Sequence, residues 1–165
     1  MRQITNALRG YLRHLEQRTK WSFLWRSWLH AVVLAYIAGN LVQLVFPVGP
    51  RADLTGKSAI DLCLVVLVAG PLVETVLFQF LPLEFTRAAN SRRWIRFAVS
   101  VIPFALMHHL AGVPTIVGAG FVGGFFFAFT YERWRSESIV VAVIMTVLLH
   151  SSFNLVGVVG MLLLR

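Results

Sequence analysis

Long stretches without a charged residue constrain the fold of this chain more than any other feature. Ser27–Pro50 and Ser138–Leu164 contain no Asp, Glu, Lys or Arg, and Glu74 is the only charge between Asp61 and Glu84. A helix that crosses a membrane needs about 20 mainly apolar residues. Each of these three stretches is long enough for one crossing.

The fourth uncharged stretch, Phe97–Tyr131, is long enough for two crossings. Gly112 and Pro114 lie inside it, and both residue types favour turns. We therefore predict an all-α integral membrane protein, a bundle of about five transmembrane helices within a single domain of residues 27–165. Gly120 and Gly124 are four residues apart, a spacing of small residues that favours close helix contact.

The composition supports the same class. The chain of 165 residues is 58% hydrophobic and only 13% charged, whereas about a quarter of a soluble domain is charged. Mean hydropathy is +0.74. Lys and Arg number 15 against 7 Asp and Glu. In a membrane protein this excess is typical of the cytoplasmic flanks of the spans, so we predict no nucleic-acid partner.

The N-terminal segment, residues 1–26, differs from the rest of the chain. Apolar side chains recur at helical spacing among basic ones, which predicts an amphipathic helix at the membrane interface. Tryptophans then mark the headgroup boundary. The apolar positions are Ile4, Leu8, Tyr11, Leu12 and Leu15, and the tryptophans are Trp21, Trp25 and Trp28.

The distribution of Lys and Arg predicts the orientation. With five spans, the flanks on one side carry 12 of these residues and the flanks on the other side carry 3. The positive-inside rule places the basic side in the cytoplasm. We predict a multi-pass protein of a prokaryotic plasma membrane with its N-terminus in the cytoplasm.

Ionisable side chains inside spans are costly and usually functional. Glu74 lies 10 residues from Glu84, His108 lies 12 from Arg96, and His150 lies 13 from Glu137. At about 1.5 Å per residue, these positions are roughly 15, 18 and 20 Å from the charged ends of their spans. Three spans therefore place a carboxyl group and two imidazoles at a similar depth.

Polar residues on the same spans extend this group. His150 and Asn154 are four residues apart and share a helix face. Thr75 and Gln79 have the same spacing, from which we predict a hydrogen bond between them. Pro71 after Gly70 predicts a local break or helix start just before Glu74, which is tolerated at the membrane midplane where helices line a cavity.

These residues form three motifs that resemble the CAAX-protease and bacteriocin-processing (CPBP, or Abi) family of intramembrane endopeptidases, related to the type II CAAX prenyl endopeptidases. "PLVETVLFQ" is similar to the family's "P..EExxxR", with Glu74 at the first glutamate. "FALMH" at Phe104–His108 is similar to "FxxxH", and "HSSFN" at His150–Asn154 to "HxxxN". The motif core covers residues 61–154.

The first motif departs from the family pattern at two positions. Thr75 stands at the second glutamate and Gln79 at the arginine. A neutral pair thus replaces a charged pair, and such a swap can cost little when both partners change together.

The resemblance implies an intramembrane endopeptidase that cleaves a membrane-tethered protein or peptide without a cofactor. Glu74 and His108 would activate a water molecule. His150 and Asn154 would stabilise the oxyanion. Thr75, Gln79 and Phe104 would support the site.

Alternative uses of the same residues remain open. Glu74, His108 and His150 would suit a catalytic zinc, although no "HExxH" is present. A membrane-binding or immunity-type protein of this fold would need no catalysis, and a proton-coupled carrier would use these side chains as a relay.

Overall fold

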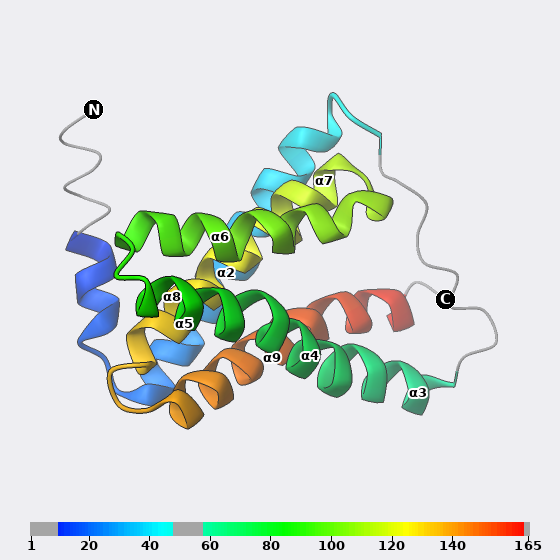
Figure 1. Cartoon of the computed structure of the whole chain (residues 1–165). Coiled ribbons are helices and arrows are strands. Elements are labelled where there is room, and N and C mark those ends of the chain that lie inside the picture. The colour runs from blue at the N-terminus through cyan, green and yellow to red at the C-terminus, as the bar shows by residue number, and fades with distance from the viewer. Residues whose placement is uncertain (1–9, 48–57, 164–165) are drawn as a thin grey trace.

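The computed structural model describes residues 10–47 and 58–163, and their regular structure is helical, without a strand. The chain forms a bundle of long helices (Figure 1). Four helices are long and apolar enough to cross a membrane, at residues 64–88, 93–111, 113–134 and 139–160. The 24-residue helix α2, Lys20–Gln43, is not among those four. The predicted all-α membrane bundle is therefore confirmed, while a fifth crossing by α2 stays a prediction.

The N-terminal segment contains two helices rather than one. Residues 10–16 are helical, and the chain then bends before α2 begins at Lys20 after Thr19, whose backbone is extended. The first nine residues of the predicted 1–26 helix lie outside the described part. Leu15 is buried and packs with Phe23, so the apolar face of the short helix contacts the bundle.

The second long helix runs from Ala59 to Ala88 and changes its winding four times. Its segments are α3 Ala59–Cys63, the π-helix η1 Leu64–Ala69, α4 Gly70–Glu74, the π-helix η2 Thr75–Phe80, and α5 Leu81–Ala88. Each π-helix ends just before a proline, at Gly70–Pro71 and Leu81–Pro82. A proline has no N–H and crowds the carbonyl four residues earlier, and a wider turn accommodates this. The chain stays helical through Gly70 and Pro71, so the irregularity predicted before Glu74 is a change of winding and not a break.

The long uncharged stretch forms two antiparallel arms. The first arm is α6 Arg93–Met107 with the 3-10 turn η3 His108–Ala111. The chain reverses at Gly112, whose φ of 88° lies in the left-handed region that glycine tolerates. The second arm is α7 Val113–Thr115, the π-helix η4 Ile116–Gly123 and α8 Gly124–Trp134. The turn predicted at Gly112 and Pro114 is confirmed.

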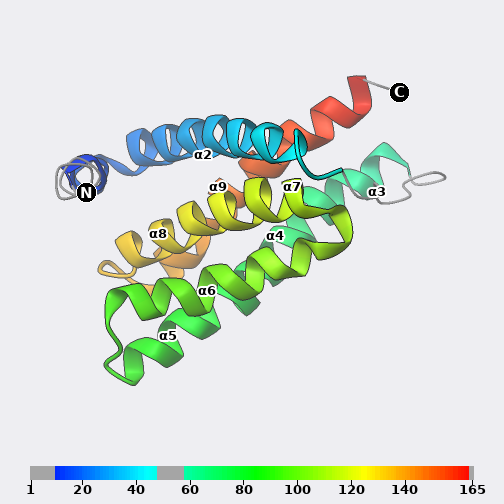
Figure 2. The same ribbon diagram turned by 90° about the horizontal axis from the view of Figure 1, so that it is seen from above.

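The last helix, α9 Ile139–Leu163, packs against α8 and also contacts α2. Seen from above, α2 lies along one side of the arm formed by η4 and α8, with α6 and α5 on the other side of that arm (Figure 2). Glycines permit this close packing. A Cβ added to Gly120 would lie 2.6 Å from Ala105 Cα, and one added to Gly124 would lie 2.8 Å from Phe104 Cδ1. The helix contact predicted for these two glycines is confirmed, and it is made with α6.

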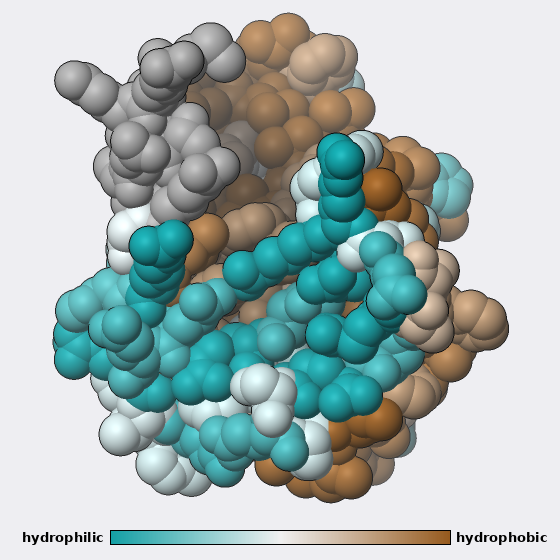
Figure 3. Space-filling view, turned by 60° about the vertical axis from the view of Figure 1, so that its left-hand side comes forward, coloured by the Kyte–Doolittle hydropathy of each residue, from teal (hydrophilic) through white to brown (hydrophobic). Residues whose placement is uncertain are grey.

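Charged side chains gather at one end of the bundle, where Figure 3 shows a hydrophilic face bordered by apolar surface. Glu132 is almost fully buried there, with its carboxylate bound by Arg96 through two contacts of 2.9 and 3.0 Å and by Arg87 at 2.9 Å. Arg135 binds both oxygens of Glu84. These ion pairs join α5, α6 and the end of α8 at the charged end of the bundle.

Candidate active site

Two of the motif side chains meet inside the bundle. Glu74 ends α4, and His150 comes from the middle of α9. The Nε2 atom of His150 lies 3.5 Å from Oε2 of Glu74. This separation is longer than a good N–H···O hydrogen bond, which spans about 2.7–3.2 Å. The pair is therefore positioned for contact but open enough to tighten around a reacting group.

The side chains of Glu74 and His150 differ in how much of their surface is exposed. His150 is 2% exposed, whereas the Glu74 side chain retains 27% of its accessible surface. Gly70 lies one turn before Glu74, and a Cβ there would be 3.6 Å from Glu74 Oε1. The carboxyl group thus has one buried neighbour and one side that no described protein atom covers.

Aromatic rings fix His150 in place. Phe127 of α8 stacks on the imidazole, with ring centroids 4.2 Å apart and an angle of 25° between planes. Phe104 of α6 meets the same ring edge-on at 5.7 Å. This role of Phe127 was not predicted from the sequence. The motif alone carries no signal for it, because α8 reaches His150 only through the packing of α8 on α9.

His108 stands on the other side of Phe104. The two ring centroids are 4.9 Å apart, and Phe104 is 1% exposed. His108 Nδ1 lies 2.9 Å from the carbonyl oxygen of Phe104. A carbonyl can only accept, so Nδ1 carries the hydrogen and Nε2 of the neutral ring is left as an acceptor. Phe104 therefore acts as a wedge that holds both motif histidines, in addition to filling the core.

Asn154 has a partner that the sequence did not reveal. Its Nδ2 donates to the carbonyl oxygen of Val66 at 3.0 Å. That carbonyl has lost both possible backbone donors, because the Gly70 N–H bonds to Val65 and Pro71 has no N–H. Asn154 satisfies the carbonyl that the π-helix and the proline leave free. This contact joins α9 to η1, one helical turn from His150.

The predicted hydrogen bond between Thr75 and Gln79 is wrong. Both side chains are fully buried, yet Thr75 Oγ1 and both amide atoms of Gln79 have no hydrogen-bond partner within the described residues. The prediction assumed α-helical spacing, whereas these residues lie in the π-helix η2, where the bonding repeat is five residues. Unpaired polar groups of this kind cost about 1–3 kcal/mol each.

Trp28 is another residue whose role changes. The sequence placed it at the headgroup boundary with Trp21 and Trp25, which are indeed exposed. Trp28 instead points into the bundle, and its Nε1 donates to the carbonyl of Ser152 at 2.8 Å. It fixes α2 to α9 two residues beyond His150.

The zinc alternative would need Glu74, His108 and His150 to gather around one ion. Within residues 10–47 and 58–163, no three His, Cys, Asp or Glu side chains are grouped closely enough to hold a metal ion. Neither His108 nor Asn154 makes an ion pair or hydrogen bond with Glu74 in this part of the chain. We derive no chemical step through a metal.

Fold and site together define an integral membrane protein in which a carboxyl group and a buried imidazole meet between two helices. Residues 56–156, more than half of the chain, match the family model described as Type II CAAX prenyl endopeptidase Rce1-like. The chain belongs to this family of CAAX-type intramembrane proteases, which confirms the resemblance seen in the three motifs. The comparisons with curated proteins and with solved structures gave no match.

Proposed function

We propose that this protein hydrolyses a peptide bond of a membrane-tethered protein or peptide, with Glu74 as the general base. The observation that carries the proposal is the 3.5 Å approach of His150 Nε2 to Glu74 Oε2 inside a membrane bundle. Membership of a protease family supports hydrolysis as the reaction. The partial exposure of Glu74 supports access for water.

The chemistry needs one water molecule and two proton transfers. The carboxylate of Glu74 takes a proton as the water oxygen bonds to the peptide carbonyl carbon. His108 Nε2, an acceptor by its tautomer, holds the second water hydrogen. The carbonyl oxygen becomes an oxyanion. The C–N bond then breaks, and the proton on Glu74 passes to the leaving amine.

In this proposal His150 and Asn154 donate hydrogen bonds to the oxyanion. Preorganised donors that face developing charge contribute strongly when they are held rigidly. Phe127 and Phe104 hold the His150 ring. Asn154 uses one N–H on Val66 and keeps the second for substrate. We assign Asn154 a second task as well, because its bond to Val66 keeps η1 and the Glu74 helix against α9.

The test is proteolysis in liposomes that contain the full chain and a set of membrane-tethered peptides. Glu74→Gln keeps the side-chain shape and removes the base, so the rate should fall by about 10²–10⁴-fold. His108→Gln should also lower the rate. His109→Gln is the matched control, since His109 is the adjacent histidine, is exposed and, among the described residues, bonds only Leu106.

The pattern of rates decides the proposal. Loss of cleavage in the Glu74 and His108 variants, with His109→Gln near wild type and no effect of a chelator, would establish a glutamate-type protease. Full activity of Glu74→Gln would refute the proposal. Loss of wild-type activity on chelation would replace it with metal-dependent hydrolysis.

We also propose that the charged end of the bundle faces the cytoplasm, following the asymmetry of Lys and Arg. Cys63 is the only cysteine and is partly buried. In a Cys63→Ser background, Ser136→Cys should be labelled by an impermeant thiol reagent only in inverted vesicles. Ala111→Cys, at the opposite turn, should be labelled only in right-side-out cells.

A further inference from the structure

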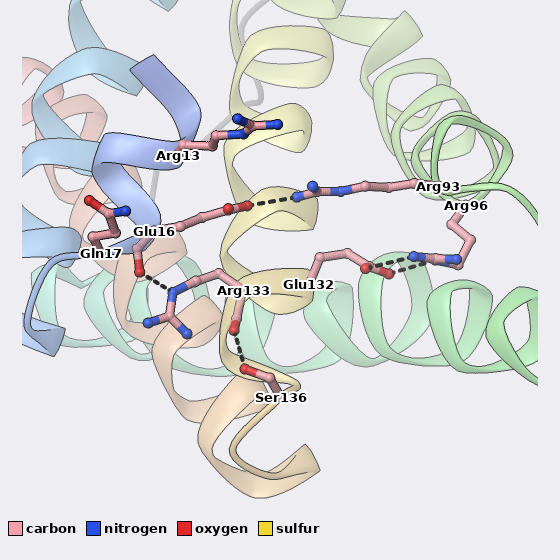
Figure 4. A pocket seen from close by; sticks show the side chains of 8 residues that line it. All are labelled: Arg13, Glu16, Gln17, Arg93, Arg96, Glu132, Arg133 and Ser136. Atoms are coloured by element: carbon pink, nitrogen blue, oxygen red, sulfur yellow. Dashed lines mark hydrogen bonds and ion pairs between the residues drawn. The ribbon is translucent and has the colours of Figure 1, made fainter. Parts of the chain in front are cut away.

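A polar hollow of about 440 Å³ opens at the charged end of the bundle. It lies between the short N-terminal helix, the start of α6 and the end of α8, and Figure 4 shows its side chains. Four arginines and two glutamates line it, which leaves an excess of two positive charges. The charged lining residues are Arg13, Glu16, Arg93, Arg96, Glu132 and Arg133.

The two glutamates are already neutralised by neighbouring arginines. Both oxygens of Glu132 are bound by Arg96, with Arg87 adding a third contact. Glu16 Oε1 is bound by Arg93 at 2.9 Å. Neither carboxylate therefore offsets the charge of the remaining cations.

Two arginines keep donor groups for a ligand. Arg133 uses Nε on the backbone carbonyl of Glu16 at 2.6 Å and lies over the Trp134 ring, so its terminal nitrogens bind no described side chain. Arg13 makes no ion pair with a described residue, and Figure 4 shows it extended beside Arg93. A planar guanidinium is well suited to phosphate oxygens.

The start of α6 adds to the positive potential. A helix N-terminus has partial positive charge and is normally complemented by acidic residues. The first turn of α6 has no acidic residue and no side-chain cap, and it carries Arg93 and Arg96 instead. An external anion would supply the missing complement.

An apolar groove of about 360 Å³ lies farther along the same two helices. Phe97 and Val101 of α6 line it together with Phe125 of α8, and the Phe97 and Phe125 rings are 5.6 Å apart. The Arg93 guanidinium lies 5.6 Å from the centre of the Phe97 ring, at the junction of hollow and groove. Trp94 lines the groove and is 66% exposed, as expected for a side chain at headgroup depth.

We propose that an anionic phospholipid binds along the contact between α6 and α8. Its phosphate lies in the arginine hollow, and one acyl chain follows the groove past Phe97 and Phe125. The charge excess selects an anionic headgroup, and the adjoining apolar groove distinguishes a lipid from a soluble phosphate. The site lies apart from Glu74 and does not depend on the proposed chemistry.

The test measures which lipids stay bound to the full chain. The protein is reconstituted in equal amounts of phosphatidylglycerol and phosphatidylcholine, extracted in mild detergent, and its retained lipid is quantified by mass spectrometry. Wild type should retain phosphatidylglycerol in excess. Arg13→Gln and Arg133→Gln should each lower this preference about fivefold, because one basic contact near an anionic surface contributes about 1 kcal/mol.

Controls separate a specific site from general attraction. Arg92→Gln removes the same charge from the same end, but Arg92 does not line the hollow, so the preference should change less than twofold. Ala98→Trp fills the groove and should weaken retention of long-chain but not dihexanoyl phosphatidylglycerol. An equal effect of Arg92→Gln and Arg13→Gln would overturn the proposal. Displacement of the lipid by millimolar inorganic phosphate would do so as well, because it would show a phosphate site without a lipid groove.

Discussion

The close approach of η4 to α6 leads to the sharpest prediction, which concerns Gly120→Ala. The new Cβ would lie 2.6 Å from Ala105 Cα and 3.0 Å from Ala105 Cβ. Ordinary contact begins near 3.4 Å, so the two helices would have to separate by about 0.8 Å. The obstacle is backbone, which cannot rotate away as a side chain would.

The expected loss of stability follows from two opposing terms. Overpacking of a well-packed interior costs about 1–3 kcal/mol. Alanine is a better helix former than glycine and returns about 0.8–1.0 kcal/mol. Gly120→Ala should therefore lower the free energy of unfolding by up to about 2 kcal/mol. Gly157→Ala in α9 is the matched control, since nothing lies within 4 Å of a Cβ there, and it should keep only the gain.

Unfolding of the full chain by SDS in mixed micelles, followed by circular dichroism, measures both variants against wild type. The propensity gain is common to both, so the variants should differ by the overpacking cost of about 1–3 kcal/mol, with Gly120→Ala the less stable. Because the substitutions are chemically identical, the difference reports only the local space. Gly120→Ala that is as stable as Gly157→Ala would refute the close packing of η4 on α6.

Three further predictions use other contacts. Asn154→Ala should lower stability by about 1–3 kcal/mol because the Val66 carbonyl loses its donor. Pro71→Ala restores an N–H near this carbonyl, so in a double-mutant cycle the double variant should recover part of the loss. Additive losses would argue against a carbonyl shared by the two positions. Glu132→Gln should cost about 3–5 kcal/mol, since it leaves Arg87 and Arg96 without their buried carboxylate, whereas Glu137→Gln breaks the exposed pair with Lys20 and should cost less than about 1 kcal/mol in the same SDS titration. Phe127→Leu should lower kcat for tethered peptides more than it changes KM, because it frees the His150 ring; an unchanged kcat would show that the stack is only packing.

The sequence by itself determined the class of protein and the candidate residues. Uncharged stretches of the right length can only be buried in a bilayer, so the helical bundle followed from hydropathy and charge. The positions of Glu74 and His150 along their spans were enough to predict similar depth. The turn at Gly112 could also be predicted, because glycine tolerates the positive φ that the backbone adopts there.

The tertiary structure alone decided which side chains touch. Spacing along one helix could not reveal that Phe127 stacks on His150, that Phe104 separates the two histidines, or that Asn154 binds Val66. It also gave a wrong hydrogen bond for Thr75 and Gln79. The depth of a residue depends on its position along its helix, which can be read from the sequence. Contact between side chains depends on how each helix is rotated, on π-turns and on the neighbouring helices, which only the packed bundle sets.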